Sequence, residues 1–235
     1  MKKIQFLLLA AIMPFIISCE KTPDTTQVQL GIKVSSTEFT SLKSFSVEEF
    51  TIDSASIVIG KIELKRDDRS QESTETENEN EYNFTGPYII DLLEGTSKPG
   101  IPVSGISPGT YNKFDAEMEF IDTIGYSFVL QGNFSNVGGE IQNIPFEYTY
   151  TQSEDFKIIN PDGFEISADM LNNVWVYIDL QQLLSGLDLS DAMVDRDDVI
   201  RLNNESNRDL ADIIEMNLEK ASELGLDDNN DGEID

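Results

Sequence analysis

Residues Ile106–Phe120 read ISPGTYNKFDAEMEF, and this stretch decides the fold class. In its second half, apolar side chains occupy every second position and charged or polar side chains occupy the positions between them. A period of two places alternate residues on opposite faces of a β-strand, with one face on a core and the other in water. Pro108 presets φ and Gly109 permits a positive φ, so a type II turn is predicted immediately before the strand.

Apolar alternation recurs along much of the chain. It predicts strands over residues 28–34, 50–65, 87–93, 101–106, 114–120, 126–132, 144–151, 156–159 and 174–180. A change of phase near Gly60 predicts a bulge in the second of these strands. The acidic run 67–81 has no aliphatic residue, and we interpret it as an exposed loop, either solvated or attracting cations. Together these patterns predict a mainly β protein, with an antiparallel β-sandwich over residues 27–180.

The last part of the chain, residues 181–235, is acidic and changes pattern. Ser206 and Asp209 have the spacing of a helix N-terminal capping box. Apolar residues from Leu210 to Leu224 then follow one helical face, and Gly225 is placed to end the helix. We therefore expect an amphipathic C-terminal helix in an extension that packs on the sandwich.

The composition excludes several kinds of chemistry. The chain has no histidine and a single cysteine, so Ser-His-Asp catalysis, Cys-His catalysis and the usual zinc sites are ruled out. Its formal net charge of −28 argues against nucleic acid and against docking on anionic lipid by charge. The sequence nominates no catalytic residue, although a carboxylate-based hydrolase stays open. We expect a non-catalytic protein.

The amino-terminal segment has the layout of a secretory signal. Lys2 and Lys3 precede an apolar run of about 14 residues, which is too short to span a bilayer comfortably. The segment ends in Ile16-Ile17-Ser18-Cys19, which resembles the lipobox of bacterial lipoproteins. An ordinary signal peptide that contains a cysteine is the alternative.

The lipobox resemblance implies that residues 1–18 are removed and that Cys19 carries the lipid. The lipid would be a thioether-linked diacylglycerol, usually with a further acyl chain such as palmitate, and several buried chains anchor a protein durably. Residues 19–26 would form a tether. Because Glu20 and not Asp follows the cysteine, the outer membrane is favoured, with its periplasmic or outward face left open.

A second resemblance covers about residues 26–125. The segments at Ile52–Ile62, Ile89–Leu93 and Ile106–Tyr111 are similar to those of a bacterial, Bacteroidetes-type lipoprotein family described as a domain of unknown function. The resemblance implies a β-sandwich comparable with carbohydrate-binding modules. It implies no catalytic residues.

Two further motifs suggest binding. The carboxyl end resembles the first nine positions of an EF-hand calcium loop, without the acid at position twelve. Its candidate Ca²⁺ ligands are Asp227, Asn229, Asp231, Glu233 and Asp235. The alternative is an acidic tail without a metal.

Trp175 and Tyr177 share one strand face and could form a platform for stacking a sugar. The alternative is that a second layer covers them. The sequence thus leaves three functions open: an envelope lipoprotein that binds a ligand, a glycan or an envelope protein; a surface carbohydrate-binding module; and a carboxylate-based hydrolase.

Overall fold

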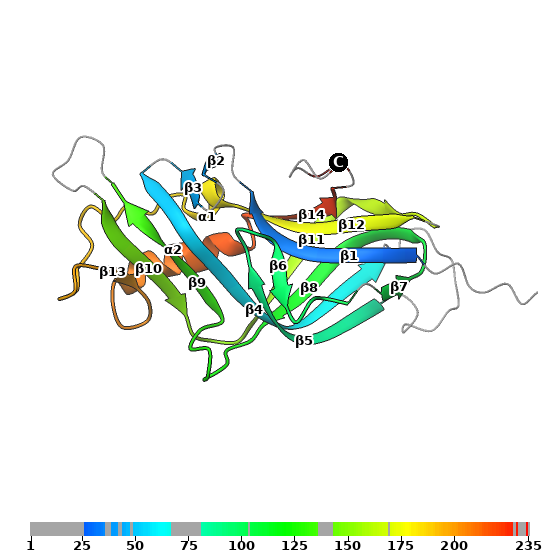
Figure 1. Cartoon of the computed structure of the whole chain (residues 1–235), viewed down its shortest axis with the longest axis horizontal. Coiled ribbons are helices and arrows are strands. Elements are labelled where there is room, and N and C mark those ends of the chain that lie inside the picture. Colours follow the sequence, from blue (N-terminus) through cyan, green and yellow to red (C-terminus); the bar gives the residue numbers. More distant parts are fainter. Residues whose placement is uncertain are drawn as a thin grey trace, which may run out of the picture.

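The computed structural model describes residues 26–35, 39–41, 44–47, 49–66, 81–102, 104–135, 143–168, 170–227, 229 and 234. Within these residues the chain forms two β-sheets and two short helices, so the predicted mainly β, two-sheet fold with a C-terminal helix is confirmed (Figure 1). The predicted signal peptide, Cys19 and nearly all of the tether lie outside the described residues, as does most of the acidic run from residue 67. No helix in the described ranges is long and apolar enough to span a membrane.

The smaller sheet has four described strands in the order β14-β12-β1-β7. They are β14 (Ser222–Leu226), β12 (Leu171–Asp179), β1 (Thr26–Ser35) and β7 (Ser104–Ile106). We call it the small sheet.

The larger sheet has ten strands among the described residues, and its main path is β11-β8-β4-β9-β10-β13. These six are β11 (Glu154–Ile166), β8 (Gly109–Met118), β4 (Phe50–Arg66), β9 (Phe128–Phe134), β10 (Ile144–Tyr150) and β13 (Ile200–Leu202). Beside β4 lie β2 (Phe39–Ser41), β3 (Ser44–Val47), β5 (Glu81–Asp91) and β6 (Thr96–Lys98). The helices are α1 (Leu180–Leu183) and α2 (Arg208–Leu218).

Strand β4 is the spine of the large sheet. Its first half pairs with β9, and its second half pairs with β5 on one side and β8 on the other. The pairing register shifts between Ile59 and Lys61 with both β5 and β8, so the bulge predicted near Gly60 is confirmed. A bulge bends the strand and increases its twist, which lets one strand serve two differently oriented halves of the sheet.

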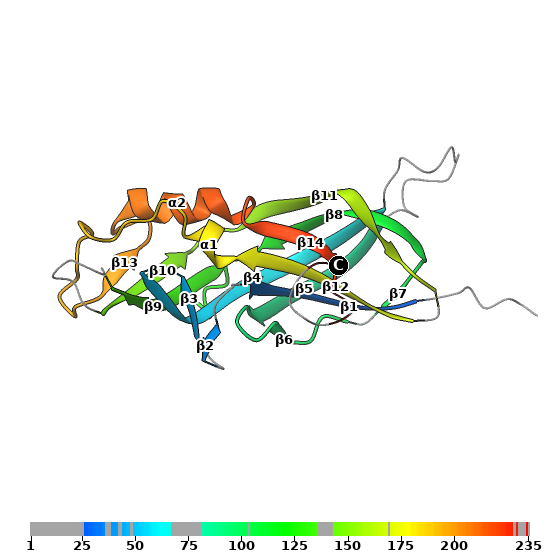
Figure 2. The ribbon, with the colours of Figure 1, turned by 90° about the horizontal axis from the view of Figure 1, so that it is seen from above.

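Two different layers cover the large sheet. The small sheet lies over one half of it, while α2 lies over β9 and β10 in the other half (Figures 1 and 2). The Val34 N–H donates to the Leu92 carbonyl at 2.8 Å, and the Asn160 side-chain amide donates to the Leu224 carbonyl at 2.9 Å. These two bonds tie the sheets together, and buried side chains from both sheets and from both helices form one continuous core.

The predicted antiparallel pairing holds for most strand pairs but is wrong for two of them. Strands β1 and β12 are parallel, and so are β10 and β13. In both pairs the partners are separated along the chain by other elements, which supplies the crossover that parallel neighbours require. Both sheets are therefore mixed.

The C-terminal helix is shorter than predicted. It ends at Leu218. Of the residues that continue the apolar stripe, Ala221 lies in the turn after the helix and Leu224 lies in β14, which pairs with β12 along Val174–Ile178. The capping-box prediction is also wrong, because the N-cap is Asn207 with φ +48° and makes no side-chain cap. Thus the region predicted as a helical extension gives one strand to each sheet.

The small sheet contains a row of residues in which a large side chain lies between two glycines. Trp175 on β12 is directly opposite Gly31 on β1 and Gly225 on β14. A Cβ atom built on Gly31 would lie 2.2 Å from the indole ring, so the ring occupies the space that any other side chain at this position would need. The indole in turn is 8% exposed.

Replacing Gly31 with alanine should destabilise the fold. The added methyl must displace the Trp175 ring, and overpacking of this kind typically costs about 1–3 kcal/mol of the free energy of unfolding. The measurement is urea unfolding of the purified protein. Gly100→Ala is the matched control, because a Cβ there meets no atom within 4 Å. Equal stability of the two variants would contradict the packing of Trp175 on Gly31.

Candidate functional site

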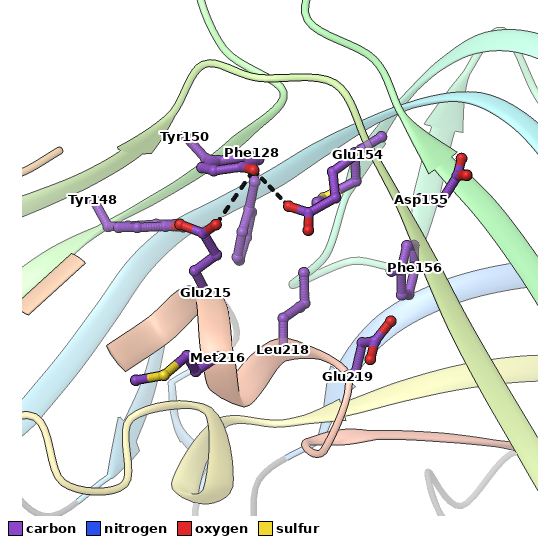
Figure 3. A pocket seen from close by; sticks show the side chains of 11 residues that line it. Phe128, Tyr148, Tyr150, Glu154, Asp155, Phe156, Glu215, Met216, Leu218 and Glu219 are labelled. Atoms are coloured by element: carbon purple, nitrogen blue, oxygen red, sulfur yellow. Dashed lines mark hydrogen bonds between the residues drawn. The ribbon is translucent and has the colours of Figure 1, made fainter. Parts of the chain in front are cut away.

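A pocket of about 270 Å³ opens where α2 meets the large sheet, and we call it the α2 pocket (Figure 3). The pocket lies beside the end of α2, because Leu218, the last residue of the helix, and Glu219, which follows it, are among its lining residues. Its lining consists of Met118, Phe128, Tyr148, Tyr150, Glu154, Asp155, Phe156, Glu215, Met216, Leu218 and Glu219. It thus draws on β8, β9, β10, β11 and the C-terminal end of α2.

The floor of the α2 pocket is apolar and aromatic. Phe128 and Tyr148 are buried and meet edge to face, with their ring centroids 5.5 Å apart. Phe156 and Leu218 are also buried, whereas Met216 is 62% exposed. An apolar floor beside an exposed apolar side chain is the surface on which the hydrophobic part of a ligand is stabilised.

Carboxylates line the rim, and two of them approach a single hydroxyl group. The Tyr150 hydroxyl donates to Glu154 Oε2 at 2.5 Å, and Glu215 Oε1 lies 3.5 Å from the same hydroxyl oxygen (Figure 3). A phenol has one proton, so it can donate to only one of these acids at a time. Asp155 stands apart from this pair, beyond the β11 ribbon in Figure 3.

The electrostatics of the pocket shift the pKa values of its groups. Loss of surrounding water raises the pKa of Glu215, and the negative charges of Glu154 and Asp212 raise it further. Loss of water also raises the pKa of Tyr150, with further contributions from Glu154 and Glu215. Both shifts have the same main origin, the loss of surrounding water, and the neighbouring negative charges add to it.

Local contacts hold the rim in place. The Ser127 hydroxyl donates to the Gln152 carbonyl at 2.6 Å, and the Phe120 N–H donates to the Ser153 hydroxyl at 3.0 Å. These bonds fix the turn that joins Tyr150, at the end of β10, to Glu154, at the start of β11.

The carboxyl end of α2 is fixed to β11 through Glu219, the residue that follows the helix. The Lys157 N–H on β11 donates to Glu219 Oε1 at 3.2 Å. Within the helix, Ile214 and Leu218 are buried against the sheet, which places Glu215 beside the buried face. The acids of strand and helix are therefore positioned by backbone elements and not by flexible loops.

The residues that line the α2 pocket determine which ligands it can accept. None of the pocket's lining residues is basic, so an anion would meet only repulsion there. Among the described residues, no three acidic side chains lie close enough together to hold a metal ion. The α2 pocket thus offers hydrogen-bond acceptors, negative charge and an apolar floor.

A second hollow, of about 320 Å³, lies over a charged surface of β4, β8 and β11. Lys65 bridges Glu63 and Asp115 at 2.8 Å each, and hydrogen bonds from Lys61 and Lys65 lower the pKa of Glu63 to about 2. Most of its charged groups are paired with one another, although the buried Asp115 Oδ1 accepts no hydrogen bond within the described part of the chain. Partly exposed pairs of this kind add little stability. We interpret this surface as a solvated sheet face.

The structure buries the two aromatic residues that could have formed a sugar platform. Trp175 and Tyr177 are 8% and 4% exposed, and the Lys33 ammonium lies 4.6 Å from the Trp175 ring and 4.9 Å from the Tyr177 ring. A cation above both rings leaves no open aromatic face for a pyranose. The interpretation that both residues are covered is therefore the correct one.

The expected calcium loop follows a strand and not a helix. Asp227 directly succeeds β14, is fully buried, and accepts a hydrogen bond from the Tyr177 hydroxyl, with Lys33 Nζ at 3.8 Å from its carboxylate. Asp227, the first candidate ligand of the loop, is thus engaged within the small sheet. Asn229 is described and exposed, whereas three candidate ligands lie outside the described residues: Asp231, Glu233 and Asp235.

The sequence did not identify Tyr150, Glu154 or Glu215. The two acids are on separate elements, far apart along the chain, and neither belongs to a motif. One signal was present for Glu215, because it follows Ile214 on the apolar stripe of the predicted helix. An acid at the margin of such a stripe lies where a helix meets its sheet.

The raised pKa of Glu215 predicts how stability depends on pH. Below the ordinary glutamate pKa, Glu215 is protonated in both the folded and the unfolded chain. Above that pKa the unfolded chain ionises first, so the free energy of unfolding falls as the pH rises, until the folded-state pKa of Glu215 is passed. Glu215→Gln removes this loss and should be more stable than the parent at pH 7, with no difference near pH 4. We expect about 0.5 kcal/mol, because solvent screens an exposed carboxylate.

Thermal unfolding from pH 4 to pH 8 measures the effect. Glu165→Gln, an exposed acid on β11 that does not line the α2 pocket, is the control and should follow the parent at every pH. A Glu215→Gln variant that is less stable than the parent at pH 7 would contradict the electrostatic description of the rim.

Comparisons of the chain with family models, with curated proteins and with solved structures found no match. The resemblance to a lipoprotein family therefore stays a prediction. A function must be inferred from the residues and geometry of the chain itself.

Proposed function

We propose that this chain is a non-catalytic, lipid-anchored protein of the cell envelope that binds a small ligand in the α2 pocket. The observation that carries the proposal is the pocket itself, in which an apolar floor meets convergent hydrogen-bond acceptors. Binding sites for small molecules combine a mostly apolar lining with a few fixed polar groups. At about 270 Å³ the pocket is slightly smaller than the usual ligand pocket of about 300–1,000 Å³, so its ligand is small.

Binding without catalysis is favoured by the residues that are missing from the chain. It has no histidine, and its single cysteine is the expected lipid attachment site. No serine, threonine, cysteine or lysine lines the α2 pocket, so the only nucleophiles that its lining could offer are carboxylates and tyrosine hydroxyls.

The location is proposed from the amino-terminal segment. The signal-like run and the lipobox-like ending at Cys19 support a lipid anchor, and Glu20 supports the outer membrane. The tether before β1 would keep the sandwich close to the bilayer. The negative charge of the chain would at the same time prevent the sandwich from docking on anionic headgroups.

A carboxylate-based hydrolase is the second candidate. Glu154 and Glu215 share one tyrosine hydroxyl, and the pKa of Glu215 is raised, as is expected of a general acid. Release of nitrophenol from a panel of nitrophenyl glycosides, lost in both Glu154→Gln and Glu215→Gln, would favour this candidate over simple binding.

The anchor predicts a specific labelling result. Cells that express the chain and are fed radiolabelled palmitate should incorporate label into it, and Cys19→Ser should abolish the incorporation because the thioether cannot form. The variant should also leave the membrane fraction, since acyl chains supply the binding to the bilayer. A Cys19→Ser chain that stays labelled would contradict the proposed anchor.

The pocket predicts binding of small aromatic probes. We choose 2-phenylethylammonium, 2-phenylethanol and 3-phenylpropanoate, which share a ring and differ in charge. At least one should bind the purified full chain, and Met216→Gln should weaken that binding about threefold to tenfold, because an apolar contact worth about 1 kcal/mol is lost at the exposed edge of the floor. Isothermal titration calorimetry measures the affinities.

Met193→Gln is the matched control, because Met193 is as exposed as Met216, at 64%, and does not line the α2 pocket. It should bind the probes like the parent. If none of the three probes binds, or if both methionine variants bind like the parent, the α2 pocket is not the ligand site.

A further inference from the structure

The charge of the α2 pocket points to the class of its ligand, an inference that rests on the proposed function. Glu154, Glu215 and Glu219 contribute carboxylates from two elements, and none of the lining residues is basic. Arg208, on the first turn of α2, does not line the pocket; it lies 4.0 Å from Asp212, and its charge offsets part of the rise in the pKa of Glu215. The acids of the rim therefore have no cationic partner among the residues that line the pocket.

Hydrogen bonding at Tyr150 leaves a place for a donor. The Tyr150 hydroxyl is 2.5 Å from Glu154 Oε2 and 3.5 Å from Glu215 Oε1, so its single proton is shared unequally and Glu215 has only a long hydrogen bond to it. Two ionised acids close to one hydroxyl repel each other. A ligand with a positive charge and several N–H donors would reduce that repulsion and give Glu215 a closer donor than Tyr150.

The floor defines the remainder of the ligand. Phe128, Tyr148 and Phe156 are aromatic side chains buried beneath the rim, with Leu218 beside them (Figure 3). Aromatic faces attract cations as well as apolar groups, by about 0.5–2 kcal/mol for a well-placed cation. A ligand that has an ammonium group on an apolar body would use both the rim and the floor.

A bare metal ion fits these surroundings less well. Calcium takes six to eight oxygen ligands that converge on one point. Within the described part of the chain, no three acidic side chains meet that requirement, and much of the pocket surface is carbon. An apolar floor would contribute nothing to a hydrated ion.

We propose that the α2 pocket binds a small organic cation, an alkyl- or arylammonium, with its ammonium group between Glu154 and Glu215 and its apolar body on Phe128, Phe156 and Leu218. The exposed Met216 then covers the part of the ligand that faces the solvent. The ligand class is selected by charge first and by size second.

Calorimetric titration of the full chain with the three probes tests the proposal. 2-Phenylethylammonium should bind at least tenfold more tightly than the neutral, similarly sized 2-phenylethanol, and 3-phenylpropanoate should bind least. The advantage of the ammonium should shrink as salt is raised from 10 mM to 300 mM, because part of the attraction is between exposed charges.

The double variant Glu154→Gln/Glu215→Gln removes the charges and keeps the shape of both side chains. It should lose at least tenfold in affinity for the ammonium and nothing for the alcohol. Glu165→Gln, which removes one negative charge elsewhere on β11, should bind like the parent. Thermal unfolding shows whether each variant is folded.

The outcomes separate this inference from the function on which it rests. Equal affinity for the ammonium and the alcohol, or an unchanged ammonium affinity in the folded double variant, would overturn cation selection while leaving a binding pocket. Absence of binding by all three probes would overturn the pocket as a ligand site. Loss of ammonium binding in the double variant, but not in Glu165→Gln, supports both cation selection and the α2 pocket as the ligand site.

Discussion

The length of β4 is the constraint on which the rest of the structure depends. Its 17 residues carry buried side chains from Phe50 to Leu64, and a strand this long builds a sheet that one layer does not cover. The small sheet covers the half that holds β5 and β8, and α2 covers β9 and β10. The small sheet and α2 cannot cover the large sheet without a discontinuity between them, because side chains project differently from a strand and from a helix. The α2 pocket lies close to this change of layer.

Because the pocket lies there, its carboxylates come from elements that the core already fixes. Burial of Ile214 and Leu218 sets the position of α2, and the turn after Tyr150 sets Glu154. Placing two acids beside an apolar floor costs free energy in the empty protein, as the raised pKa of Glu215 indicates. A cationic ligand reverses that cost, so the same arrangement that weakens the fold slightly would strengthen binding.

Alternation in the sequence was enough to predict the β class, most strands and the bulge at Gly60, because a period of two is a local property. It was not enough for the residues after Leu218. There the spacing of Ala221 and Leu224 fits one helical face, yet the same residues are buried around a strand that pairs with β12. The unpaired edge of β12 decided between the two structures, and such tertiary information is absent from a local pattern. The α2 pocket was missed for the same reason.

The most direct measurement is a crystal structure of the full chain with 2-phenylethylammonium. If the proposal is correct, the ammonium nitrogen lies within hydrogen-bonding distance of Glu154 and Glu215, with the phenyl ring on Phe128 and Phe156. Density for the ligand at another place, or an α2 pocket that stays free of ligand at a concentration that saturates binding in solution, would contradict it.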